Sequence, residues 1–76
     1  MPTVLRESGV EVVIYFNDHQ PPHVHAFEGS GEAKINLDPV EVVQVWKMSK
    51  ATARKAKRVV AEHQSYLLGK WEEING

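Results

Sequence analysis

The strongest constraint on the fold is a glycine turn near the middle of the chain. The segment Glu28-Gly29-Ser30-Gly31-Glu32 suits a two-residue β-hairpin loop, because glycine at the first central position supplies the positive φ of a type II′ turn. This turn pairs Ala26 with Ala33 and Val24 with Ile35, so apolar residues share one face. A shift of one residue would mix apolar and polar side chains on both faces, which is costly. The turn therefore predicts one register.

The same register predicts a polar face on the other side of the hairpin. There it sets three cross-strand pairs, Phe27 with Glu32, His25 with Lys34 and His23 with Asn36. Alternate residues of a strand point to the same side, so the imidazoles of His23 and His25 are expected ~7 Å apart. We expect this face to be exposed to water.

The surrounding sequence predicts an α+β fold with a small antiparallel sheet of about four to five strands. Runs rich in β-branched and aromatic residues predict strands over roughly 3–46, namely Thr3–Arg6, Val10–Phe16, His23–Glu28, Glu32–Leu37 and Val40–Trp46. The prolines Pro21 and Pro22 interrupt regular structure before the third strand. Residues 1–76 are expected to form a single domain.

A single long helix is predicted over residues 50–74, packed on one face of the sheet. Ser49 is a suitable N-cap. At 100° per residue, one apolar arc contains Ala53, Ala56, Val60, His63, Leu67, Trp71 and Ile74. Gly69 is a position where this helix can kink. His63 lies on the apolar arc and is expected to be a hydrogen-bonded core residue.

The composition excludes several classes of protein. The chain has 76 residues, no cysteine and a net charge of -1, so disulfides, thiolate metal sites and thiol nucleophiles are excluded. No apolar run approaches ~18 residues, and no basic lead precedes a long apolar stretch. We therefore expect a cytoplasmic protein without a membrane partner. So short a chain buries a limited core, and homo-oligomerisation would add to its stability.

Positive charge is concentrated at the start of the predicted helix. Residues 47–58 contain six basic and no acidic side chains, whereas residues 1–46 contain two basic and seven acidic ones. Four of the basic residues, Lys50, Arg54, Lys57 and Arg58, fall on one helical arc. They form either a solvated face or a docking surface for a partner protein, RNA or DNA.

A histidine cluster is the candidate metal site. Two histidines in a His-X-His pattern on one strand can bind one ion, with a third ligand from elsewhere. Together with the preceding loop, the sequence predicts the ligands Asp18, His19, His23 and His25 for a divalent metal such as zinc or nickel.

Other uses of the same face remain open. Lys34 opposes His25, and a cation beside a divalent metal is unfavourable. His23 and His25 would instead serve as acid and base, with Lys34 stabilising a phosphorane, in a ribonuclease-like site. The histidines would otherwise contact phosphate without catalysis, or make structural or partner contacts.

The motifs also resemble a known family. The segments that carry the resemblance are Pro2–Arg6, Asn17-Asp18-His19, Pro21-Pro22-His23-Val24-His25, Gly31-Glu32-Ala33-Lys34 and Leu37-Asp38-Pro39. They are similar to the small bacterial proteins of domain of unknown function 4160. The resemblance implies an uncharacterised cytosolic protein, often encoded beside a small protein of family 2442 in a toxin–antitoxin-like arrangement. The matched positions are Asp18, His19, His23, His25, Glu32 and Lys34, and no catalytic role is assigned to them.

Overall fold

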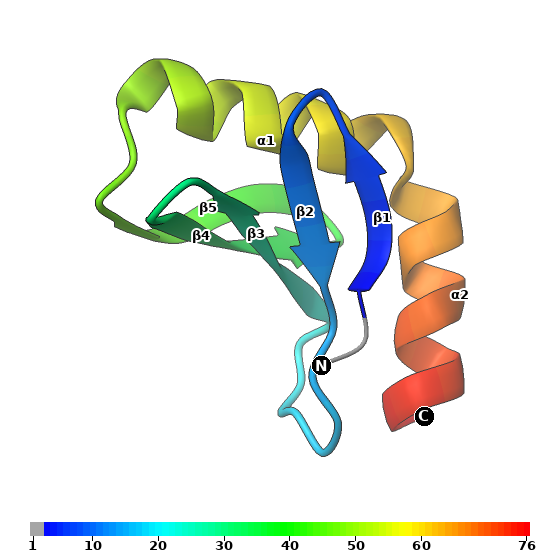
Figure 1. Cartoon of the computed structure of the whole chain (residues 1–76). Helices are drawn as coiled ribbons and strands as arrows, with labels where there is room; N and C mark the ends of the chain where they lie inside the picture. The colour runs from blue at the N-terminus through cyan, green and yellow to red at the C-terminus, as the bar shows by residue number, and fades with distance from the viewer. Residues whose placement is uncertain (1–2) are drawn as a thin grey trace.

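The computed structural model describes residues 3–76 as an α+β fold in which two helices pack against a five-stranded antiparallel sheet (Figure 1). The strands follow one another across the sheet in chain order: β1 (Thr3–Glu7), β2 (Val10–Val13), β3 (His23–Glu28), β4 (Gly31–Leu37) and β5 (Val40–Trp46). The helices are α1 (Lys50–Glu62) and α2 (Gln64–Asn75).

The predicted register of the central hairpin is confirmed at all six positions between β3 and β4. Gly29 has a φ of 59°, as its place in the turn requires. The register of this hairpin puts four apolar residues on the helix side of the sheet, where they are fully buried: Val24, Ala26, Ala33 and Ile35. Because the pleat alternates, His23 and His25 are both assigned to the opposite side.

The second strand ends earlier than predicted, at Val13 instead of Phe16. The backbone carbonyl of Tyr15 accepts a hydrogen bond from Nδ2 of Asn75 at 3.0 Å. A side chain from the end of the molecule thus replaces a strand partner, and the chain leaves the sheet to begin the loop that holds Asp18.

The prediction of one long helix is wrong, because the helix breaks at His63. His63 has φ -119° and ψ 24°, and its Nε2 lies 2.8 Å from Oε1 of Glu7 in β1. Gln64 donates to the carbonyl of Leu37, and the Tyr66 hydroxyl donates to the carbonyl of Val4. These contacts accompany the turn that places α2 alongside β1 (Figure 1), and each adds a hydrogen bond between the second half of the helical region and the sheet.

The predicted apolar arc is confirmed in part despite the break, since four of its seven residues are buried and Ala53, His63 and Ile74 are half-buried. Ala56, Val60, Leu67 and Trp71 are buried in the core. Ser49 caps α1 as predicted, its hydroxyl accepting from the Thr52 amide. Gly69 lies inside α2 and produces no break there. Within residues 3–76, neither helix is long and apolar enough to cross a membrane.

Candidate metal centre

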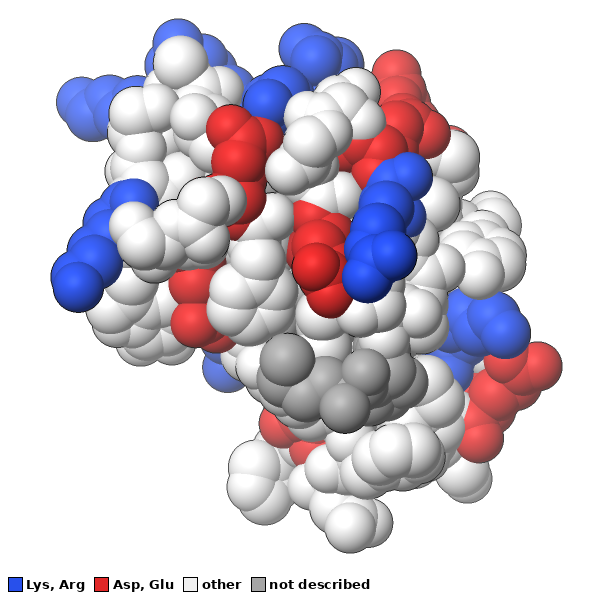
Figure 2. Space-filling view, in the orientation of Figure 1, with Lys and Arg blue, Asp and Glu red and all other residues white. Residues whose placement is uncertain are grey.

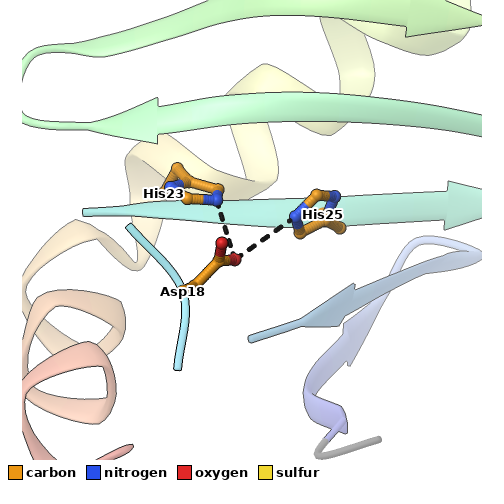
Figure 3. Close-up of side chains that lie close together, drawn as sticks. All are labelled: Asp18, His23 and His25. Atoms are coloured by element: carbon orange, nitrogen blue, oxygen red, sulfur yellow. Dashed lines mark ion pairs between the residues drawn. The ribbon is translucent and has the colours of Figure 1, made fainter. Parts of the chain in front are cut away.

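Three predicted ligands meet where the loop before β3 folds back over that strand. Asp18 lies in the loop, and His23 and His25 lie in β3 (Figure 3). The Asp18 Oδ2 atom is 2.9 Å from Nε2 of His23 and 3.7 Å from Nε2 of His25. The two imidazole centroids are 5.3 Å apart. The prediction that both rings share one side of the strand is therefore confirmed.

The other nitrogen of each ring is held by an acceptor. Nδ1 of His23 donates to the backbone carbonyl of Pro21 at 2.9 Å. Nδ1 of His25 donates to the Glu32 carboxylate at 3.0 Å. A carbonyl and a carboxylate only accept, so each bond places a proton on Nδ1, and in a neutral ring the Nε2 lone pair then faces Asp18.

The Asp18 carboxylate is itself anchored on one side. Its Oδ1 atom accepts a hydrogen bond from the backbone amide of His19 at 3.1 Å. The backbone amide of Asp18 donates to Oδ1 of Asn75 at 3.1 Å. The Oδ2 atom is buried and accepts no hydrogen bond, although it lies 2.9 Å from His23 Nε2. With both rings neutral, Oδ2 and the two Nε2 atoms are all acceptors, and a shared cation would satisfy all three.

The expectation that this face is exposed to water is wrong for His23, which is only 3% exposed. Its ring packs against Trp71 of α2, with centroids 5.1 Å apart. The His25 ring, half-buried, packs against Tyr15 at 4.5 Å. The sheet twists, and α2 turns away from α1, so the second helix and the loop cover part of a face that a single straight helix would have left open.

Tyr15 reports on the electrostatics of the cluster. Burial raises the pKa of its hydroxyl above the ordinary value of 10.0, and the negative charges of Glu32 and Asp18 raise this pKa further. Two carboxylates thus lie close to the imidazoles, and their negative charge favours a bound cation.

His19 and Lys34 do not join the cluster. Asp18, His23 and His25 are the residues whose ligand atoms all lie within 4.8 Å of one another, and the exposed His19 is not among them. Lys34 opposes His25 as predicted, but within residues 3–76 its amine makes no hydrogen bond or ion pair with either imidazole. Glu32, diagonally across from His25, makes the contact instead.

His63 belongs to a separate group at the helix junction. It is bonded to Glu7, which confirms that it is hydrogen-bonded, but the prediction that it is a core residue is wrong, because its side chain is 32% exposed beside the edge strand β1. Glu62 also lies near it, but its side chain is exposed. These contacts explain the helix break without a ligand.

The predicted basic surface is formed by residues of α1. Lys50, Arg54, Lys57 and Arg58 are all exposed, and no ion pair to any of them is found among residues 3–76. Lys55, by contrast, lies 2.6 Å from Glu28. Figure 2 shows lysine and arginine side chains along the upper edge of the molecule, where Figure 1 places α1.

Sequence reasoning missed the groups that support the ligands. The position of Glu32 two residues before Lys34 was a usable signal, because a diagonal neighbour on the adjacent strand is within reach of a long side chain. Trp71 and Asn75 gave no local signal. They reach the cluster only because α2 turns at His63.

The fold and this cluster define a small α+β protein with a buried aspartate–histidine site. The family model described as "Domain of unknown function (DUF4160)" matches residues 9–72, and the chain belongs to this family. No curated protein and no solved structure matches the chain.

Proposed function

We propose that this protein binds a divalent transition-metal ion through Asp18 Oδ2, His23 Nε2 and His25 Nε2. One observation carries the proposal: both Nδ1 atoms are held by outward acceptors, and both Nε2 atoms converge on a buried carboxylate oxygen without a hydrogen bond. Histidine ligands of metals are usually oriented in this way, by a carbonyl or carboxylate bonded to the other ring nitrogen.

The spacing of the three atoms suits an ion. Zinc binds imidazole nitrogen and carboxylate oxygen at about 2.0–2.2 Å, which separates neighbouring ligand atoms by about 3–3.5 Å. The observed separations from Oδ2 are 2.9 Å and 3.7 Å, and all three ligand atoms lie within 4.8 Å of one another, so side-chain adjustment would bring them to the spacing that an ion requires. Two imidazoles and one carboxylate suit zinc, nickel or ferrous iron, and three protein ligands leave a position for water or a further ligand.

The alternatives draw less support from the geometry. A His23 imidazolium paired with Asp18 would make the cluster a structural lock without metal, and this use would leave the Nε2 atom of His25, 3.7 Å from Oδ2, without a hydrogen-bond partner. Acid–base cleavage of RNA would need phosphate to reach both rings. His23 is buried, and within residues 3–76 Lys34 makes no hydrogen bond or ion pair with either imidazole, so the geometry gives that use no support.

Metal titration of untagged protein tests the proposal. After dialysis against a chelator, calorimetry with Zn²⁺ should give one ion per chain, and Co²⁺ should give the visible absorption of a nitrogen–oxygen site. His25→Ala and Asp18→Asn should each lower the affinity by more than about a hundredfold, because loss of a supporting group alone costs about 10–100-fold.

His19→Ala is the matched control, since it removes an exposed imidazole from the same loop. Its affinity should equal that of the unaltered protein. Absence of stoichiometric binding would refute the proposal. So would equal losses in His19→Ala and His25→Ala, which would indicate scattered surface histidines.

A further inference from the structure

The two edges of the sheet differ in what covers them. At one edge, α2 lies alongside β1, and the Tyr66 hydroxyl donates to the Val4 carbonyl at 2.9 Å. At the other, β5 has β4 as its only partner strand within residues 3–76. Large apolar side chains are exposed on this strand: Val43 by 42%, Val45 by 44% and Trp46 by 45%. Proteins usually protect such an edge, because it offers unpaired backbone donors and acceptors to another chain.

A hollow of about 340 Å³ lies between this edge strand and α1. Val42 and Ala53 supply apolar lining, and Lys50, Arg54 and Lys57 bring positive charge from the helix. Glu41 is the acidic residue among those lining it, so the hollow carries an excess of two positive charges. The register places Val42 and Val45 on the same side of the sheet as α1, whereas Trp46 lies on the other side.

We infer that β5 accepts an extended acidic segment of a partner protein, which adds to the sheet as a sixth strand. Side chains of an added strand alternate between the two sides of the sheet. Acidic residues at alternate positions would face Lys50, Arg54 and Lys57, and apolar residues between them would pack beside Trp46. Backbone pairing would supply affinity, and this alternation would supply specificity.

The charges favour this occupant over two others. In a second copy joined edge to edge about an axis perpendicular to the sheet, both α1 helices would lie on one side, and their unpaired cations would repel. A nucleic acid would use the cations but not the strand edge, and Glu41 would oppose its phosphates. The inference rests on β5 and α1, so it stands independently of the metal centre.

Amide exchange on labelled protein tests the inference with defined peptides. The probe is a capped peptide of alternating glutamate and valine, compared with one of alternating lysine and valine and with a uridine oligonucleotide. The glutamate peptide should slow hydrogen exchange at the β5 amides, and added salt should reduce this protection because it screens the charges. The lysine peptide and the oligonucleotide should leave β5 unchanged.

Reversing the charge of two basic residues of α1 provides a second test of the inference. The double substitution Arg54→Glu and Lys57→Glu affects exposed positions in a helix and should weaken binding of the glutamate peptide by more than about tenfold. Lys70→Glu, on α2, is the matched control and should leave binding unchanged. Circular dichroism should show that both variants are folded.

Three results would overturn the inference: no β5 protection at millimolar glutamate peptide, equal affinity in the double variant, or protection of β5 by the oligonucleotide. A dimer of the unaltered protein with protected β5 amides would assign this edge to a second copy and would also overturn it. None of these outcomes would contradict the proposal that the protein binds a metal ion through Asp18, His23 and His25.

Discussion

At the scale of single residues, the site depends on which ring nitrogen each histidine presents. Neither imidazole is free to turn, because the Pro21 carbonyl and the Glu32 carboxylate each hold an Nδ1 atom. The ring of His23 is also packed against Trp71. Such preorganisation means that an ion meets the Nε2 atoms without the cost of reorienting either side chain.

Glu32→Gln should lower the affinity for zinc by about 10–100-fold while leaving the fold intact. Glutamine can still accept from His25 Nδ1, but it lacks the charge that makes the imidazole a stronger ligand. Glu41→Gln is the control, because Glu41 is an exposed carboxylate of the same sheet outside the metal cluster. Calorimetry of the two variants would contradict this role of Glu32 if their affinities were equal.

A second residue-scale prediction concerns two glycines. A Cβ at Gly31 would lie 2.6 Å from the Lys47 carbonyl oxygen and 3.0 Å from the Met48 Cβ, whereas a Cβ at Gly69 would meet nothing within 4 Å. Gly31→Ala should therefore destabilise the protein by about 1–3 kcal/mol. Gly69→Ala should stabilise it by about 1 kcal/mol, because Gly69 lies within α2. Urea unfolding measures both, and equal changes would contradict this assignment.

The candidate site could be predicted only as far as the strand pattern extends. The hairpin turn sets the side of β3 on which His23 and His25 lie, and Asp18 was identifiable from the loop that precedes them. Which nitrogen faces the loop, and whether water reaches it, depend on Pro21, Glu32 and Trp71. The Trp71 contact joins positions 48 residues apart, and no local pattern encodes it.

At the scale of elements, the start and the break of the helical region have different causes. The start is local, since the Ser49 hydroxyl accepts from the Thr52 amide three residues ahead. The break at His63 depends on distant groups, Glu7 and the carbonyls of Leu37 and Val4. The cap was therefore predictable from sequence, and the break was not, because the apolar period continues through it.

Ser49→Ala should destabilise the protein by about 1 kcal/mol, because it removes the side-chain acceptor for a free amide of α1. Ser65→Ala is the control. Ser65 is exposed in α2, and its substitution should change the free energy of unfolding by less than about 0.5 kcal/mol. Thermal unfolding followed by circular dichroism distinguishes the two, and a silent Ser49→Ala would contradict the role of the cap.

At the scale of the whole molecule, the end of the chain holds the loop that carries Asp18. Asn75, in the last turn of α2, donates to the Tyr15 carbonyl and accepts from the Asp18 amide. The chain that leaves β2 and the loop that holds Asp18 are thus both bonded to one side chain of the second helix. The five strands were predictable from local patterns, but this closure was not, because it joins positions 57 and 60 residues apart.

Asn75→Ala should release this loop. We expect faster amide exchange at Asp18, and a lower affinity for zinc because its carboxylate is no longer held beside the imidazoles. Glu72→Ala, an exposed position of the same helix, should change neither. If the zinc affinity of Asn75→Ala matched that of Glu72→Ala, the loop would be held by the histidines alone.

Metal binding should also stabilise the whole fold, because the ligands come from a loop and a strand that are brought together only in the folded chain. Zinc at a hundred times its dissociation constant should add about 2.7 kcal/mol to the free energy of unfolding. In a domain of this size, this gain corresponds to a rise of about 11–22 °C in melting temperature. A chelator should reverse the rise, and His25→Ala should abolish it, whereas His19→Ala should retain it. An unchanged melting temperature under saturating zinc would show that the cluster closes without an ion, as a hydrogen-bonded lock between loop and sheet.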